Sequence, residues 1–390
     1  MPKLRFPGFE GEWENTELGN LAIYGKDKTR VTKNHFVSTE NIEQNFGGIV
    51  PFEDSKTMVD GTEFTKGDIL IANIRPYLKK IWQSDMDGAC NADVLVLKPQ
   101  EIDNVFFYFL VAQNKFIDYV MGGVKGSKMP RGDKAHILQY NTAVPSILEQ
   151  QQIAKFLSLL SNRIATQKEL VETLKKYKRG VFEAIFSQRL RLVPKEEQKS
   201  WKAFKLSDFT TRITRKNSGT TDIPLTISAQ YGLIDQRNFF SKVVASTDMG
   251  GYYLLHNGEY AYNRSTSNDY PFGSIKRLEL YDKGAVSTLY LCFSINENVV
   301  MSDLAKWYFE SSQWYQGVNE ICAEGARNHG LLNVPTDGFF STIHILPSDT
   351  EEQAKIVMFL SRIHYKLVQA QKELEKLICL RNGLLQQLFI

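Results

Sequence analysis

Two stretches of this chain place apolar residues at alternating steps of three and four, the spacing of a helix that pairs with another helix. We take these positions as the seam of a helical pair: Leu157, Leu160, Ile164, Val171, Leu174, Val181 and Ile185, then Leu360, Ile363, Leu367, Leu374, Leu377, Leu384 and Leu388. Each member of the second set lies 203 residues after its counterpart (360 − 157 = 203). Gln167 and Lys178 fill the two polar positions of the first seam, and the cationic position Lys178 returns as Arg381. The pattern predicts two long helices with matching faces.

The segments that precede these helices also repeat. Trp13 and Leu18 match Trp201 and Leu206 at an offset of 188 (201 − 13 = 188), and Pro145 matches Pro347 at 202 (347 − 145 = 202). Further matches between these points keep the same order, and their offset changes only in small steps. An ordered series of weak matches indicates an internal duplication with loop insertions and deletions.

Each repeat mixes strand and helix patterns. Short apolar runs rich in β-branched and aromatic residues predict strands at 69–71, 94–97, 260–262 and 289–293. Segments 105–120 and 303–315 are predicted as helices, and their aromatic residues on several faces favour a packed core over a binding platform. The first long helix is predicted over 149–187, before Pro194, and would span roughly 55–60 Å. Glu149-Gln150 and Glu352-Gln353 fall in the first turns, where the helix dipole favours acidic residues.

Composition changes this picture little. The 390 residues are 43% hydrophobic, carry a formal charge of +3 and contain no long apolar run, which favours a globular cytoplasmic protein. The four cysteines lack Cys-x-x-Cys spacing, so we expect reduced, partly buried thiols. The sequence contains no phosphate-binding loop, nucleophile elbow or zinc-ligand spacing. It therefore indicates no catalytic residue and no metal site.

Cations and amides recur in loop-like segments at corresponding places in the two repeats. Arginine can pair with guanine and asparagine with adenine, whereas lysine suits phosphate contacts. The DNA-contact candidates are Lys28, Arg30, Lys33, Asn34, Arg75, Lys79, Lys128 and Arg131, then Arg212, Arg215, Lys216, Asn217, Asn263, Arg264, Lys276, Arg327 and Asn328. For any single residue, a solvated surface charge is an equally good interpretation.

The chain resembles the specificity subunits of type I restriction-modification systems along essentially its whole length. The resemblance rests on the opening 4–13, on Gly67-Asp68-Ile69-Leu70 and on Pro-x-x-x-Glu-Gln before each long helix. Its strongest parts are Lys-Glu-Leu in each helix and a closing Gly-x-x-x-x-x-Phe, at 180–186 and 383–389.

The resemblance implies an α+β fold with pseudo-twofold symmetry. Two duplicated target-recognition domains, 1–148 and 194–349, would be separated by helices 149–193 and 350–390, packed as an antiparallel intramolecular coiled coil. Such a chain would read an asymmetric bipartite target in double-stranded DNA without being an enzyme itself. It would dock methyltransferase subunits, two in number, and restriction subunits through the complex. S-adenosylmethionine would be held by the methyltransferase subunits, and ATP and Mg by the restriction subunits.

The outer helix faces, with Gln167, Lys168, Lys175, Lys176 and Arg179, are the expected docking place for the methyltransferase subunits. Two other classes of function stay open. The chain could be a non-catalytic coiled-coil adaptor that binds protein partners, which salt-insensitive binding without DNA protection would favour. It could also be an enzyme with scattered carboxylates, such as a nuclease, which would need metal-dependent cleavage by the purified chain.

Overall fold

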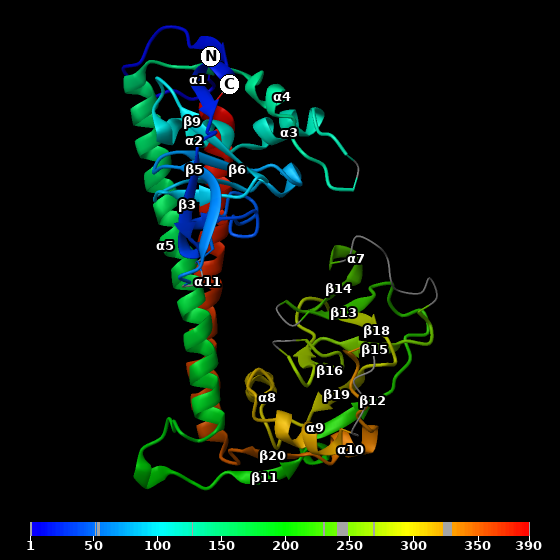
Figure 1. The fold of residues 1–390 in the computed structure, drawn as a ribbon. Helices are drawn as coiled ribbons and strands as arrows, with labels where there is room; N and C mark the ends of the chain where they lie inside the picture. Colours follow the sequence, from blue (N-terminus) through cyan, green and yellow to red (C-terminus); the bar gives the residue numbers. More distant parts are fainter. Residues whose placement is uncertain are drawn as a thin grey trace. The chain divides into compact units, whose positions relative to one another are not determined.

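A computed structural model describes residues 2–50, 52, 55–126, 128–228, 231–239, 249–267, 270–322 and 330–389. The chain divides into two compact units (Figure 1). Unit 1 comprises Met1–Glu169 and Lys372–Ile390, and unit 2 comprises Leu170–Gln371. Each unit therefore contains one of the two sequence repeats and part of each long helix.

The two predicted long helices are α5, Ile147–Phe186, and α11, Thr350–Leu388. In unit 1, the first turns of α5 share a core with the last turns of α11, through Leu157 and Leu388. In unit 2 the end of α5 packs against the start of α11, through Ile185 and Leu360. The helices are therefore antiparallel within each unit, as expected (Figure 1).

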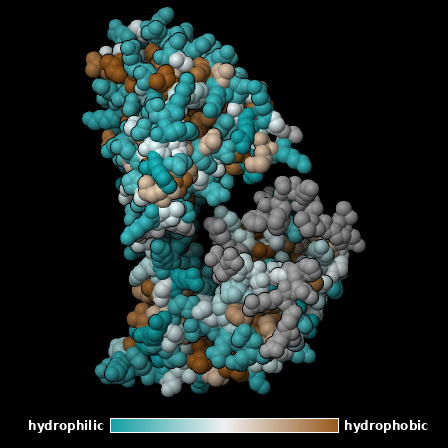
Figure 2. All heavy atoms as spheres, viewed as in Figure 1, coloured by the Kyte–Doolittle hydropathy of each residue, from teal (hydrophilic) through white to brown (hydrophobic). Residues whose placement is uncertain are grey.

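The seam positions divide by depth. The buried ones are Leu157, Ile164, Val171, Val181, Ile185, Leu360, Ile363, Leu367 and Leu388, and the half-buried ones are Leu160, Leu174, Leu374, Leu377 and Leu384. Hydrophilic residues cover most of the described surface seen in Figure 2. Gln167 was predicted both as a polar position of the seam and as a residue of the outer face; at 8% exposure the seam position is confirmed and the outer-face position was wrong. It occupies one of the two polar positions in the seam itself.

Unit 1 is built on three sheets. The pair β1-β10 is antiparallel, and the sheets β2-β9-β6-β7 and β3-β5-β8-β4 follow it. The strands are β1 Glu14–Glu17, β2 Ala22–Tyr24, β3 Lys28–Thr32, β4 Phe36–Val37, β5 Met58–Phe64, β6 Ile69–Ala72, β7 Ile81–Gln83, β8 Gly88–Cys90, β9 Val94–Pro99 and β10 Asn141–Val144. The helices are α1 Leu18–Leu21, α2 Asn104–Val111, α3 Asn114–Gly122 and α4 Lys134–Leu138, with short 3-10 turns η1 Lys33–His35 and η2 Pro76–Leu78.

Unit 2 has counterparts of the first two sheets, but two two-stranded sheets stand in place of the third among its described residues. Its sheets are β11-β20, β12-β19-β16-β17, β13-β14 and β15-β18. The strands are β11 Lys202–Lys205, β12 Thr210–Ile213, β13 Leu225–Ser228, β14 Gly232–Asp235, β15 Tyr253–His256, β16 Tyr260–Asn263, β17 Ser274–Arg277, β18 Lys283–Val286, β19 Leu291–Ile295 and β20 Ile343–Leu346. The helices are α6 Leu206–Phe209, α7 Gln236–Phe239, α8 Ser302–Tyr308, α9 Tyr315–Ile321 and α10 Thr336–Phe340, with the turn η3 Lys195–Glu197.

The same anchoring contacts occur in both repeats. Gln150 of α5 accepts a hydrogen bond from Asp103 N at 2.9 Å and donates to Pro145 O at 2.9 Å. Gln353 of α11 likewise accepts from Met301 N at 2.8 Å and donates to Pro347 O at 2.9 Å. Asp103 and Met301 are the N-caps of α2 and α8. The repeated contacts therefore show that α2 and α8 correspond in structure, in addition to the sequence matches.

Two arginine–glutamate pairs complete this correspondence. Arg5 contacts Glu149 through two nitrogens, each at 2.8 Å, and Arg191 contacts Glu352 at 2.8 and 2.9 Å. Both carboxylates are buried, at 1% and 3% side-chain exposure. The repeated Glu-Gln pairs therefore do more than complement a helix dipole, because they fasten each domain to its helix.

Both aromatic-rich helices are shorter than predicted. The segment predicted at 105–120 divides into α2 and α3, and the segment at 303–315 divides into α8 and α9. In the first, the Gln113 side chain donates to Phe109 O and Leu110 O and ends α2. The aromatic residues are core, as predicted: Phe106, Phe107, Phe116, Tyr308 and Trp314 are at most 2% exposed.

The fold is therefore α+β, with two long helices packed together in each unit. All four cysteines are free; Cys90 and Cys292 are buried, Cys322 is half-buried and Cys379 is exposed. Among the described residues, no helix is long and apolar enough to cross a membrane.

Candidate nucleic-acid interface

Two candidate cations of unit 1 flank the turn η2, directly after the buried strand β6. Arg75 and Lys79 both have positive φ, 53° and 56°, although neither is glycine. Such backbone conformations persist where surrounding structure fixes them, and they cluster at functional sites. Between them Tyr77 is 48% exposed. The turn therefore presents exposed Arg75 and Tyr77 to solvent, with half-buried Lys79 beside them.

A second loop is hydrogen-bonded to this turn. Arg75 N donates to Pro130 O at 2.8 Å, and Gly132 N donates to Asn73 O at 3.2 Å. The loop carries exposed Lys128 and also Arg131, whose guanidinium lies 2.9 Å from the Asp93 carboxylate. The structure thus brings together three candidates that lie in two distant parts of the sequence: Arg75, Lys128 and Arg131.

The far side of that loop is fixed by Asp133. Its carboxylate pairs with Lys125 and accepts hydrogen bonds from the backbone amides of His136 and Ala135, which caps helix α4. The hydrogen bond from Lys125 is the main reason that the pKa of Asp133 falls to about 2. The segment between Lys125 and Asp133 is therefore held at both ends.

The remaining candidates of unit 1 lie on a different strand. Lys28 and Arg30 are exposed on β3, an edge strand, where Lys28 donates to Thr62 Oγ1 at 2.9 Å. Arg30 lies 3.8 Å from the exposed Asp60. Lys33 and Asn34 follow in η1, where Asn34 accepts a hydrogen bond from Thr32.

In unit 2, Arg212 is exposed on β12 and makes no ion pair with any described residue. Arg215 donates to Glu259 at 2.6 Å and to Leu254 O at 3.1 Å. Lys216 donates to Gly251 O at 2.9 Å and lies 4.6 Å above the Tyr253 ring. Arg215 and Lys216 are therefore packed beside β15 and the residues on either side of it.

Four other candidates of unit 2 have internal partners. Asn217 is 1% exposed, and its amide donates to Thr221 O at 2.9 Å, closing a loop. Lys276 is 8% exposed and pairs with Glu310. Asn263 accepts from Ser265 N at 3.0 Å, and Arg264 donates to Leu289 O at 3.0 Å. Arg327 and Asn328 lie outside the described residues.

The sequence reasoning missed two exposed apolar residues in the unit 1 cluster. Tyr77 lies between Arg75 and Lys79, and Met129, 49% exposed, lies between Lys128 and Arg131. Apolar side chains beside cations can stack on or wedge between bases. The signal that could have found them is the alternation of cationic and apolar residues within single loops.

Known proteins resemble parts of this sequence. A family model described as "Type I restriction modification DNA specificity domain" matches residues 10–176. The chain is 28% identical over 93 residues to the Type I restriction enzyme EcoDI specificity subunit of Escherichia coli, covering 24% of this chain and 21% of that protein. It is 26% identical over 205 residues to the Type I restriction enzyme MjaVIII specificity subunit of Methanocaldococcus jannaschii, covering 48% and 44%. The matches thus span less than half the length of either relative.

Solved structures show the fold over a longer range. The type I restriction-modification S subunit from M. genitalium superposes with a TM-score of 0.58 at 15% identity, over 100% of this chain and 99% of that one. A chain from a structure on complex assembly and conformational transition of the type I system superposes with a TM-score of 0.55 at 15% identity, over 96% of each. Residues 10–176 are therefore similar to the DNA specificity domain of type I restriction-modification systems, and the whole chain has the fold of these solved S subunits.

Proposed function

We propose that this chain is the non-catalytic DNA-specificity subunit of a type I restriction-modification complex and reads an asymmetric bipartite target. The observation that carries the proposal is the joining of the Arg75 turn to the Arg131 loop, which lies inside the segment matched by the DNA specificity domain. This end of the domain presents guanidinium groups that can pair with guanine, and lysines that can contact phosphate.

Each repeat would read one half-site, with residues 1–148 and 194–349 as the two recognition domains. The two repeats place their candidate cations differently. Arg75, Lys128 and Arg131 gather around one turn in unit 1, whereas Arg212, Arg215 and Lys216 follow β12 in unit 2. Because the two surfaces differ, the two half-sites would differ in sequence.

The long helices, in segments 149–193 and 350–390, would set the distance between the half-sites. Helix α5 has 40 residues, so its length is about 60 Å at 1.5 Å per residue. Half-sites on the same face of DNA lie about 34 Å apart for each helical turn. A rod of this length would therefore leave an unread gap between two short half-sites.

The helices would also dock the methyltransferase subunits. Leu170 and Tyr177 on α5 are 46% and 52% exposed, and Met358 and Tyr365 on α11 are 51% and 64% exposed. The two residues of each pair are seven positions apart. Because seven residues fall only about 20° short of two full helical turns, the two side chains of a pair lie on the same face of their helix. Lys168, Lys175, Lys176 and Arg179 are exposed on α5. S-adenosylmethionine would be bound by the methyltransferase subunits, and ATP and Mg by the restriction subunits.

A domain exchange tests the two-reader arrangement. Residues 1–148 would be replaced by those of a divergent relative, and the methylated motif would be mapped by sequencing the host DNA. We expect one half-site to change while the other half-site and the gap stay the same. A change in both half-sites would contradict the proposal that each domain reads independently.

Point variants test the unit 1 surface in the complex with methyltransferase subunits. Arg75→Gln or Arg131→Gln should weaken specific DNA binding about 5- to 150-fold if the residue contacts a base, the equivalent of about 1–3 kcal/mol. Loss of a phosphate contact should instead reduce the salt slope by about 0.9. Lys66→Gln is the matched control, because exposed Lys66 precedes β6, whereas Arg75 follows it.

The adaptor hypothesis predicts a different result. A coiled-coil adaptor would bind its protein partners in a salt-insensitive manner and would leave DNA unprotected in a footprint. Protection of two separated half-sites by the complex, lost between 50 and 200 mM salt, would reject it.

A further inference from the structure

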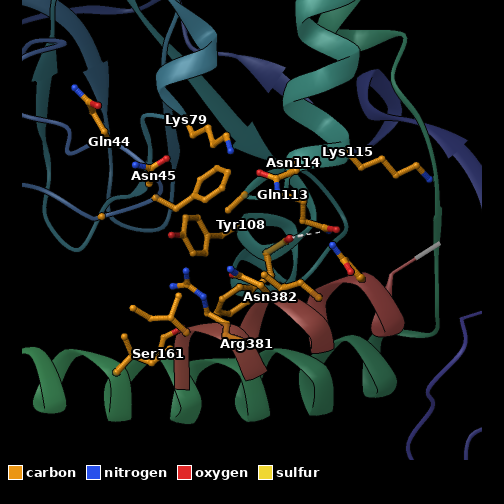
Figure 3. A pocket seen from close by; sticks show the side chains of 18 of the residues that line it. Gln44, Asn45, Lys79, Tyr108, Gln113, Asn114, Lys115, Ser161, Arg381 and Asn382 are labelled. Carbon is orange, nitrogen blue, oxygen red and sulfur yellow. Dashed lines mark hydrogen bonds between the residues drawn. The ribbon is translucent and has the colours of Figure 1, made fainter. Parts of the chain in front are cut away.

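Unit 1 contains a pocket of about 790 Å³ between its recognition domain and its helix segments (Figure 3). The loop 43–47 and the junction of α2 with α3 form one side. Residues 161–168 of α5, the end of α11 from residue 378 and Phe389, which follows it, form the other. All of these segments belong to unit 1. The cations that line the pocket are Lys79, Lys115, Lys168 and Arg381, and the acids are Glu43 and Asp118.

The duplication supplies an internal reference for this pocket. Helices α2 and α3 correspond to α8 and α9 at an offset of 198, which matches buried Ile102 with Val300 and buried Val120 with Val318 (300 − 102 = 198; 318 − 120 = 198). The long helices correspond at 203. The repeated bonds of Gln150 and Gln353 to the N-caps of α2 and α8 support both offsets.

In unit 2 the corresponding place is filled by side chains. The Glu310 carboxylate lies 3.8 Å from Lys178 Nζ and also pairs with Lys276. Lys178 Nζ lies 5.5 Å from the centre of the Trp307 ring, and Trp307 lies 5.1 Å from the His364 ring, centre to centre. The seam cation of this repeat therefore has a carboxylate partner and aromatic neighbours.

Unit 1 keeps the cation but loses the groups around it. Arg381 stands for Lys178, whereas Ala112 replaces Glu310, Phe109 replaces Trp307 and Ser161 replaces His364 (310 − 112 = 198; 307 − 109 = 198; 364 − 161 = 203). All four residues line the pocket. Three smaller side chains in place of larger ones explain why a hollow exists here.

Arg381 has no internal counter-charge among the described residues. The residue is half-buried, its Nε is buried without a hydrogen-bond partner, and no ion pair joins it to Glu43 or Asp118. It lies near Tyr108, where its charge opposes the rise in pKa that burial causes. An arginine stays charged in proteins, so a half-buried guanidinium with an unsatisfied Nε favours an anion.

We propose that the pocket binds the carboxylate of an acidic peptide segment from a partner protein, paired with Arg381 as Glu310 is paired with Lys178. A carboxylate is the anion that the second repeat uses, and the acids Glu43 and Asp118 in the lining disfavour a polyanion such as DNA. The pocket is far larger than one carboxyl group, and Asn45, Asn114 and Asn382 line it with amides that can pair with a peptide backbone (Figure 3).

The binding test uses the full chain and three probes: acetyl-Gly-Glu-Gly amide, its glutamine counterpart and succinate. Binding would be followed by calorimetry. We expect the glutamate peptide to bind at least tenfold more tightly than the glutamine peptide, and Arg381→Gln to abolish the difference. Arg163→Gln is the matched control, because exposed Arg163 lies on α5 between the lining residues Ser161 and Ile164 but does not line the pocket.

Equal binding of the two peptides, or unchanged selectivity in Arg381→Gln, would overturn the proposal. Succinate that binds as tightly as the peptide, with the same dependence on Arg381, would overturn the assignment to a peptide.

A second test needs no ligand. Ala112→Glu recreates the arrangement of unit 2, so it should raise the unfolding temperature relative to Ala112→Gln and abolish binding of the glutamate peptide. In the Arg381→Gln background, the two substitutions at Ala112 should give the same unfolding temperature. An advantage of glutamate that persists without Arg381 would refute the pairing.

Discussion

Replacing Gln150 by leucine should destabilise unit 1 through two specific lost hydrogen bonds. Gln150 is 5% exposed, accepts from Asp103 N at 2.9 Å and donates to Pro145 O at 2.9 Å. Leucine has similar bulk but neither a donor nor an acceptor, so it leaves both backbone groups without this partner. An unsatisfied buried polar group costs about 1–3 kcal/mol, and the Asp103 contact is only partly buried. We expect a total loss of about 2–4 kcal/mol.

The expected change in unfolding temperature follows from the size of the unit. For a domain of 150–250 residues, 1 kcal/mol corresponds to about 2–4 °C, so the variant should unfold about 4–16 °C lower. Because Asp103 is the N-cap of α2, amide hydrogen exchange should also accelerate at the start of that helix. Calorimetry and exchange measured by mass spectrometry report these two effects.

The matched control is Gln151→Leu, since Gln151 is the next residue of α5 and is exposed. We expect its unfolding temperature to stay within about 2 °C of the parent protein, because surface substitutions usually change stability by less than about 0.5 kcal/mol. If Gln150→Leu unfolded no earlier than Gln151→Leu and left exchange in α2 unchanged, the anchoring role of Gln150 would be refuted. Gln353→Leu should act in the same way on α8 in unit 2.

Three further predictions concern charge and reactivity. Burial lowers the pKa of His344 from 6.5 to about 4, so this imidazole stays neutral when folded, while the unfolded chain takes up a proton below pH 6.5. Stability should therefore be complete above pH 6.5 and fall by up to about 3 kcal/mol as the pH approaches 4, and His344→Gln should flatten that dependence in thermal melts. Glu310→Gln leaves Lys178 and Lys276 without their carboxylate and should cost unit 2 about 2–4 kcal/mol in chemical denaturation, whereas removal of exposed Glu297 should cost almost nothing. Exposed Cys379 should react with a thiol reagent in the native chain. Burial raises the thiol pKa of Cys90 and Cys292 to about 12, so these two should react only on unfolding. Fast labelling of Cys90 in the native chain would contradict the buried core.

Several features of the fold follow from local pattern and could be predicted from sequence. The step of three and four residues indicated both long helices, and their observed bounds, 147–186 and 350–388, are close to the expected ones. Strands such as β6 and β16 were predicted because short apolar runs bounded by glycine turns have few alternatives. The duplication strengthened each of these inferences, because two weak patterns in the same order support one another.

Other features depend on neighbours that are distant in sequence. The end of α2 is set by Gln113 bonding back to Phe109 and Leu110, a choice that periodicity does not encode. Gln167 has a polar side chain of the kind usually found at the surface, yet its position in the seam buries it. Asn217 resembles a base-reading amide in sequence, but the fold uses its side chain to close a loop.

The repeated architecture, the helix seam and the class of candidate residues can be read from spacing and residue type. Which candidates meet cannot be read in this way, because contact between Arg75 and the Arg131 loop depends on hydrogen bonds between segments more than 50 residues apart (131 − 75 = 56). The same reason applies to the seam cations. Lys178 and Arg381 are equivalent in sequence, but Glu310 neutralises one and Ala112 leaves the other facing a pocket, since charge compensation is decided by the residues packed around a side chain.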